Sequence, residues 1–120
     1  MFFKTEVRWY RIYASAEEAR ARIPLNKAEA ITVGGKKICI AHTSEGLFAI
    51  QDKCPHNGFS LSQGVCTEDN AIVCPLHRYR FDLRTGRAKS GLGDAGRVYP
   101  VESRDDGVYL GMEYTKFSLF

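Results

Sequence analysis

The chain has 120 residues, 44% hydrophobic and 26% charged, a length and balance typical of one globular domain. Its net charge of +3, from 17 basic and 14 acidic residues without a Lys/Arg run, does not indicate a nucleic-acid partner. Charges at short intervals in residues 1–15 argue against a signal peptide, and no stretch reaches the ~18 apolar residues of a membrane span. We therefore expect a cytoplasmic protein whose four Cys residues are ligands or buried thiols rather than disulfides.

The first predicted elements are a strand and a helix. Residues 5–14 mix aromatic and β-branched residues with charges, which indicates a half-exposed strand. Residues 15–23 form the one plausible helix. Ser15 and Glu18 can make a capping box at its start, and Pro24 ends it.

The rest of the chain is predicted to form short strands and turns. Gly-containing turns separate three strands of an antiparallel meander, and a final hairpin surrounds Asp105-Asp106-Gly107. The meander strands are expected at 28–33, 36–42 and 47–52, and the hairpin strands at 97–103 and 108–112. This pattern predicts an all-β antiparallel sandwich or small barrel with one short helix.

Between residues 54 and 77 the chain reads CPHNGFSLSQGVCTEDNAIVCPLH, with a Cys-x-His and a Cys-x-x-His pair. Cys54, His56, Cys74 and His77 thus offer two thiolates and two imidazoles from two similar loops. This donor set suits a two-iron, two-sulfide cluster in which one iron takes two Cys and the other takes two His. The same donors also suit a structural zinc, but zinc fingers usually group their Cys apart from their His. The alternating order therefore favours the iron–sulfur cluster, with zinc as the alternative.

The remaining Cys and His residues are expected to have other roles. Cys39 lies in an alternating strand pattern, where a small buried hydrophobe is the simplest interpretation. Cys66 lies between the two ligand pairs, but two Cys and two His already complete a cluster. His42 ends the strand that contains Cys39 and is expected at the surface.

The ligand motif resembles that of the Rieske [2Fe-2S] family. Beyond the four ligands, the resemblance extends to Gly58, to the Pro residue after each ligand Cys, and to Phe81-Asp82. It implies a single Rieske domain over 1–120, built as a base β-sandwich with an inserted cluster-binding subdomain at about 53–89. It also implies that Cys54 and Cys74 bind the inner iron and His56 and His77 the outer one. The two His ligands would then be exposed at the tip of the domain, where a titratable ring can couple electron transfer to a proton.

Several positions depart from the high-potential members of that family. Phe59 and Leu76 stand where those members have a disulfide that joins the two loops. Tyr79 and Phe81 stand where they have hydroxyl groups that donate to sulfur. Fewer donors make reduction harder, so we predict a potential toward the low end of the Rieske range, roughly −150 mV.

Three further positions are unusual. Arg78 replaces the Gly that most such ferredoxins have after the second His ligand, so the turn is expected to be slightly reshaped. Residues 90–96 would form a third loop over the cluster; they contain three Gly and no Pro, which favours a mobile lid. The aromatic C-terminus (113–120) can be an edge strand, a dimer contact or a packed tail, of which we expect the packed tail.

The resemblance implies a small ferredoxin, an electron-transfer component rather than an enzyme by itself. Such ferredoxins carry single electrons from a flavin-containing reductase to the terminal oxygenase of a ring-hydroxylating system. Residues 91–96, GLGDAG, match the letters of GxGxxG, but a strand rather than a helix is expected directly after them, so the dinucleotide-binding unit is not indicated. No 2-His-1-carboxylate motif is present either, so we expect no flavin, nicotinamide or mononuclear iron site. The alternative is a redox subunit of a larger complex, such as the small subunit of nitrite reductase with its large subunit as partner. The sequence leaves the oligomeric state open.

Overall fold

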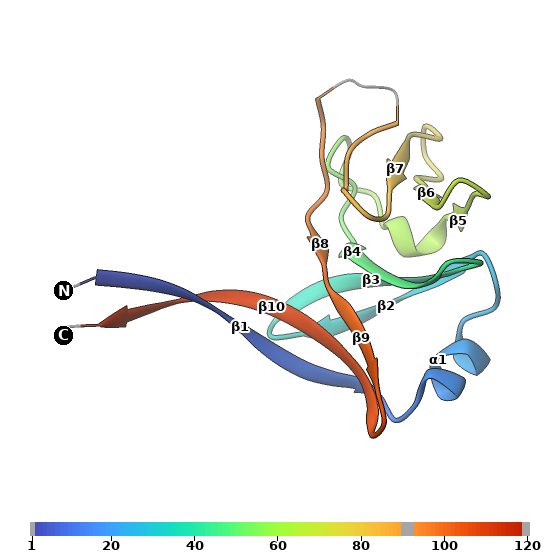
Figure 1. Cartoon of the computed structure of the whole chain (residues 1–120). Coiled ribbons are helices and arrows are strands. Elements are labelled where there is room, and N and C mark those ends of the chain that lie inside the picture. Colours follow the sequence, from blue (N-terminus) through green and yellow to red (C-terminus); the bar gives the residue numbers. More distant parts are fainter. Residues whose placement is uncertain (1, 90–92, 119–120) are drawn as a thin grey trace.

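The computed structural model describes residues 2–89 and 93–118, which fold mainly into antiparallel β-sheets (Figure 1). The strands are β1 (Phe2–Tyr13), β2 (Lys27–Val33), β3 (Lys36–Thr43), β4 (Gly46–Gln51), β5 (Val65–Cys66), β6 (Ala71–Val73), β7 (Arg80–Asp82), β8 (Val98–Tyr99), β9 (Val101–Arg104) and β10 (Gly107–Ser118). The helices are α1 (Ala16–Arg22) and the 3-10 helix η1 (Leu61–Gln63). The predicted all-β class with one short α-helix is confirmed.

Three sheets organise the molecule, with strand orders β1-β10-β9, β2-β3-β4-β8 and β5-β6-β7. The first two enclose one core, in which the inward-facing residues of β3 pack against those of β10. The third sheet lies with η1 at one side of the β2–β4 layer (Figure 1) and shares a second core with it. Phe81 of this sheet and Ile50 of β4 are both fully buried there. The small sheet is therefore held rigidly on the larger one.

The helix begins where the sequence predicts. Ser15 is the N-cap, and its hydroxyl accepts a hydrogen bond from the Glu18 backbone N–H at 3.0 Å. The Glu18 carboxylate reaches back to the Ala14 N–H at 2.9 Å, one residue before the position that a standard capping box uses. The cap thus satisfies two backbone donors at the entry to α1.

The chain ends differ from the prediction. As far as Ser118 the C-terminal residues form a strand rather than a packed tail, and residues 108–118 of β10 pair with β1. Leu119 and Phe120, which belong to the predicted tail, lie outside the described residues. Phe117 is 47% exposed, so it is not buried against the domain. The predicted strand at 97–103 is divided into β8 and β9 at Pro100, which lacks the N–H that a continuous ladder needs.

Within the described part of the chain, no helix has the length and apolar character needed to cross a membrane.

Candidate metal centre

The two predicted ligand pairs lie in two loops of the same backbone design. In the first loop (53–60), the Cys54 N–H donates to the Phe59 carbonyl and the Gly58 N–H donates to the Cys54 carbonyl, each at 2.8 Å. In the second loop (73–80), the Cys74 N–H donates to the Tyr79 carbonyl and the Arg78 N–H donates to the Cys74 carbonyl, again each at 2.8 Å. Each loop therefore presents its Cys at the same point of the same turn.

The turn requires a left-handed backbone four residues after each Cys. Gly58 has φ +80° and Arg78 has φ +58°. Glycine adopts this conformation without steric cost, whereas a residue with a Cβ is strained there. Arg78 therefore stands at a position that favours glycine, yet its turn keeps the two hydrogen bonds of the first loop, so the expected reshaping is not seen in the hydrogen-bond pattern.

The two ligand histidines do not occupy equivalent positions in the two turns. His56 follows its Cys by two residues and His77 by three, so Leu76 is the structural counterpart of His56. Both imidazoles are nevertheless exposed and near each other, with ring centroids 6.4 Å apart in an edge-on arrangement. The different spacings thus bring the rings together from opposite loops.

The two predicted ligand cysteines are buried and in contact with each other. Cys54 is 2% and Cys74 0% exposed. Burial raises the pKa of the Cys54 thiol, the backbone N–H groups of Asn57 and His56 act to lower it, and contact with the Cys74 thiol raises it again. Backbone N–H groups already directed at a sulfur suit a thiolate ligand. The pair therefore provides a buried, partly pre-organised dithiolate site.

This donor set fits a two-iron cluster better than a single metal ion. A tetrahedral zinc needs all its ligands around one point. Among residues 2–89 and 93–118, no three His, Cys, Asp or Glu side chains are grouped so that they could hold one ion. In a mixed-ligand [2Fe-2S] centre each iron takes only two protein ligands, so such convergence is not required.

Two neighbours of the site were not predicted from the sequence. The Asn57 side-chain amide lies 3.6 Å from Cys74 Sγ, and its Oδ1 accepts a hydrogen bond from the Phe59 N–H at 2.9 Å. Asp94 Oδ2 lies 3.1 Å from His56 Nδ1. Asn57 is a polar residue of the first ligand loop, directly after His56, so its position in the sequence could have indicated it. Asp94 is 38 residues away from His56, and no local pattern indicates the contact.

The other Cys and His residues lie away from the ligand pairs. Cys39 is fully buried in β3, and burial raises the pKa of its thiol, as expected for a structural residue. Burial likewise raises the pKa of Cys66 to about 11, and its Sγ is directed at the Lys27 carbonyl. His42 is a correction to the prediction, because it is half-buried and its Nδ1 lies 2.7 Å from the Ile23 carbonyl oxygen. It thereby ties β3 to the end of α1.

The segment 53–97, which contains both ligand loops, carries the whole excess of positive charge. Residues 53–97 contain seven basic and four acidic residues, whereas the rest of the chain contains ten of each. Lys53, Arg78 and Arg87 are exposed and form no ion pair among the described residues. Exposed apolar side chains accompany them, with Leu76 at 52% and Phe59 at 37%. The exposed side of the two loops is therefore an apolar surface with unpaired cations.

The predicted lid is described only in part. Residues 90–92 lie outside the described residues, so the expected mobility of 90–96 is not addressed. The Gly96 N–H donates to the Gly86 carbonyl at 2.7 Å, which attaches the end of this segment to the second ligand-loop region. That attachment carries Asp94 to His56.

Comparison with known proteins identifies the motif. The family model of the Rieske [2Fe-2S] domain matches residues 8–98. The ferredoxin subunit of anthranilate 1,2-dioxygenase from Burkholderia cepacia is 38% identical over 66% of this chain and 73% of its own length. The ferredoxin subunit of biphenyl dioxygenase from Pseudomonas sp. (strain KKS102) is 34% identical over 69% of this chain and 79% of its own length.

Solved structures share the fold. The ferredoxin of carbazole 1,9a-dioxygenase from Nocardioides aromaticivorans IC177 superposes with a TM-score of 0.71 at 26% identity, covering 85% of this chain and 95% of that one. A putative NADH-dependent nitrite reductase small subunit from Mycobacterium tuberculosis reaches a TM-score of 0.74 at 14% identity, covering 95% of this chain and 99% of that one. The second likeness concerns the fold alone.

Proposed function

The chain belongs to the Rieske [2Fe-2S] domain family, and from this premise we propose that it is a one-electron carrier that takes electrons from a reductase and passes them to a terminal oxygenase. The observation that carries the proposal is the paired ligand loops, with Cys54 and Cys74 buried and His56 and His77 exposed. The ferredoxin subunits of dioxygenase systems among its relatives support the choice of partners. We also propose a cytoplasmic location, consistent with four free Cys residues.

In this proposal the two Cys and the two His side chains have different roles at the site. Cys54 and Cys74 hold the inner iron in a buried environment that excludes water. His56 and His77 hold the outer iron and present their ring edges at the surface, where a partner can approach. When bound, the cluster accepts and releases one electron at a time. The remaining residues fix the position and the electrostatics of these four ligands.

The domain organisation follows the same proposal. The chain is one domain over 1–120, with a cluster-binding subdomain at about 53–89 that contains both ligand loops and the β5-β6-β7 sheet. Gly96 and Asp94 support extending the functional unit to the segment after this insert, because they link it back to Gly86 and His56.

The first test is the visible spectrum, iron and sulfide content, and reduced-state EPR spectrum of the purified protein. We expect two irons and two sulfides per chain and a rhombic signal of low average g. A protein with one zinc that also fails anaerobic reconstitution with iron and sulfide would contradict the proposal.

Substitutions test the ligand assignment separately. Cys54→Ser or Cys74→Ser is expected to abolish cluster retention. His56→Cys or His77→Cys is expected to lower the potential or lose the cluster. Cys66→Ser and His42→Gln are matched controls that should keep the spectrum unchanged. An unchanged spectrum and potential in either ligand-His variant would exclude that residue as a ligand.

A second candidate is a redox subunit of a larger enzyme complex. The putative nitrite reductase small subunit shares the fold over 95% of this chain, but at 14% identity that likeness does not favour this role over the carrier. Stable co-purification with a large flavin or sirohaem subunit would support it, whereas electron transfer to an oxygenase by the isolated chain would support the carrier.

A further inference from the structure

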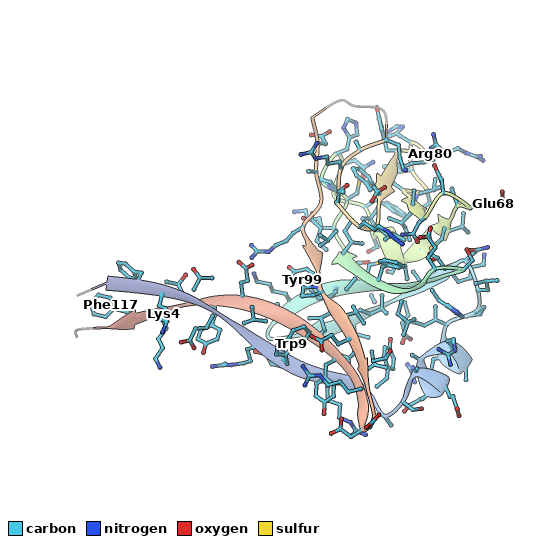
Figure 2. The ribbon with its side chains drawn as sticks, viewed as in Figure 1. Lys4, Trp9, Glu68, Arg80, Tyr99 and Phe117 are labelled. Atoms are coloured by element: carbon cyan, nitrogen blue, oxygen red, sulfur yellow. The ribbon has the colours of Figure 1, made fainter. Side chains whose placement is uncertain are left out.

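The paired ends of the chain form a two-stranded arm that leaves the rest of the molecule. Residues 2–7 of β1 pair with 113–118 of β10, in a register that places Phe3 opposite Phe117 and Val7 opposite Glu113. Figure 1 shows both termini at the far end of this arm, and Figure 2 shows Lys4 and Phe117 near its end. Most of the arm lies outside the part of the chain that the family model matches, residues 8–98. An isolated two-stranded ribbon is at best marginally stable in water, so the arm is incomplete by itself.

One long edge of the arm has no partner strand in this chain. The sheet order β1-β10-β9 places β1 at the edge, and within the described residues this strand of 12 residues pairs only with β10. One face of the arm is also apolar: Phe3 is 71%, Phe117 47% and Val7 45% exposed. Long exposed edges with apolar side chains are templates for another strand. The arm therefore offers a strand-pairing surface.

The charges of β1 define which strand fits. If a second β1 pairs antiparallel about a two-fold axis through Val7, Glu6 of each copy lies opposite Arg8 of the other. In the same register Lys4 faces Tyr10, and Val7 faces its own symmetry mate. A shift of the axis to Glu6 or to Arg8 places like charges opposite each other, which is unfavourable. The register through Val7 is thus reciprocal and self-complementary over residues 3–11.

We propose that β1 is the dimer interface of this protein and that two copies pair along β1 about an axis at Val7. The two arms then form one continuous sheet of four strands, and the apolar face continues across the axis from Val7 to Val7. The β5-β6-β7 sheet and the ligand loops lie away from the end of the arm (Figure 1), so both ligand sites stay accessible. The inference concerns assembly and does not depend on the redox function.

The test is a charge-exchange series on the full chain, measured by sedimentation velocity and by light scattering after size exclusion. The wild type is expected to be a dimer. Glu6→Arg creates Arg opposite Arg and Arg8→Glu creates Glu opposite Glu. Each should therefore weaken dimerisation by about tenfold or more. An equimolar mixture of the two variants restores opposite charges in every pair and should form a heterodimer. The double variant Glu6→Arg/Arg8→Glu should again form a homodimer.

The controls are Glu17→Arg and Arg20→Glu, which make the same changes of charge on exposed positions of α1. Both should stay dimeric, and circular dichroism should show that all variants are folded. A wild type that is monomeric at about 100 μM, far above the concentrations at which specific dimers form, would overturn the proposal. Single variants that dimerise as tightly as the wild type, or a mixture that stays monomeric, would overturn it equally. If the arm became shielded from solvent only in a complex with a larger subunit, that subunit rather than a second copy of the chain would be the partner that covers β1.

Discussion

Arg78 occupies the position in the second ligand loop where the first ligand loop has glycine. It has φ +58° at the position where its counterpart Gly58 has φ +80°. A residue with a Cβ is disfavoured in this region by about 1–2 kcal/mol relative to glycine, which is partly offset by the greater freedom of glycine in the unfolded chain. The second ligand loop is therefore under more backbone strain than the first.

We expect Arg78→Gly to stabilise the protein by about 0.5–1 kcal/mol, because it relieves this strain. The measurement is the thermal midpoint of the cluster-loaded protein, followed by visible circular dichroism. Arg78→Lys is the matched control, since it keeps both the charge and the strained backbone and should leave the midpoint unchanged. Gly58→Ala introduces the same strain in the first loop and should destabilise. A loss of stability in Arg78→Gly would show instead that contacts of the arginine side chain stabilise the fold by more than the strained backbone at Arg78 destabilises it.

Asn57 is the side-chain donor nearest to a ligand sulfur. Cys74 Sγ lies 3.6 Å from its Nδ2 and 3.7 Å from its Oδ1. The Oδ1 already accepts from the Phe59 N–H, and a thiolate can only accept, so the amide N–H₂ is the group that can hydrogen-bond a ligand sulfur. Hydrogen bonds to cluster sulfurs stabilise the reduced state and raise the potential. Phe81 is buried and cannot donate, so we expect this contact to influence the potential together with the backbone N–H groups near Cys54.

Asn57→Asp keeps the oxygen that accepts from Phe59 but replaces the donor with a negative oxygen. The potential is expected to fall by tens of millivolts or more, from a value near the low end of the family range. Gln63→Glu adds the same charge at an exposed position of η1 and serves as control, so it should change the potential much less. Equal shifts in the two variants, measured by protein-film voltammetry, would indicate a general charge effect rather than a hydrogen bond to sulfur.

At the scale of secondary-structure elements, one carboxylate joins α1 to β1 and β2, in addition to the buried Ala19 and the contact of His42 with the end of the helix. Glu29 of β2 accepts hydrogen bonds from Tyr13 of β1 at 2.5 Å and from Arg22 of α1 at 3.1 Å. Burial acts to raise the pKa of Glu29, but the hydrogen bonds from Arg22 and Tyr13 outweigh it and hold the pKa below its ordinary 4.5. Three elements thus meet at one ionised group.

Glu29→Gln is expected to cost about 1 kcal/mol at neutral pH. Most of this comes from the part-buried Tyr13 contact, because Arg22 is 55% exposed and its ion pair is screened. Since the folded-state pKa is lowered, the stabilisation by the carboxylate is complete above about pH 4.5 and is lost as the pH falls through the lowered value. The melting temperatures of wild type and Glu29→Gln should therefore differ at about pH 7 and converge as the pH falls through the lowered pKa of Glu29. Glu17→Gln, on the exposed side of α1, should show no such convergence. A constant difference across this range would mean that the charge of Glu29 is not what holds α1.

The elements that the sequence predicted well are those with local signals. The β2-β3-β4 meander was predicted because Gly34-Gly35 and Gly46 mark its turns and the strands alternate between them. The strand β5 and the helix η1 were missed because two or three residues carry no periodic pattern. The extension of β10 was missed because Glu113–Phe117 pairs with β1, a contact across the whole chain. The same limit applies to the site: the four ligands follow from local spacing, whereas the Asp94 contact depends on tertiary structure.

At the scale of the whole molecule, net charge is distributed unevenly between residues 53–97, which contain both ligand loops, and the rest of the chain, here called the base. All of the net +3 lies in residues 53–97, and the base is neutral. Lys53 adjoins Cys54, Arg78 adjoins His77, and Arg87 lies in the segment that pairs with Ala95 next to Asp94. The unpaired cations therefore lie in or beside the segments that carry the exposed histidines, through which the electron is proposed to leave.

This arrangement predicts the sign of the salt dependence for electron transfer to small oxidants. A reduced protein with a positive surface at its exit should react with ferricyanide, an anion, at a rate that falls several-fold between about 10 mM and 0.2 M ionic strength. With a cationic oxidant such as tris(phenanthroline)cobalt(III), the rate should rise over the same range. Arg78→Gln/Arg87→Gln should flatten both dependences, whereas Arg20→Gln/Lys116→Gln changes the net charge equally on the base and should leave them almost unchanged. Because screening acts over about 10 Å at 0.1 M salt, only charges near the exit influence the rate strongly. If the two double variants behave alike, total charge rather than the local surface governs the approach of a partner, and the cations around the ligand loops have no directing role.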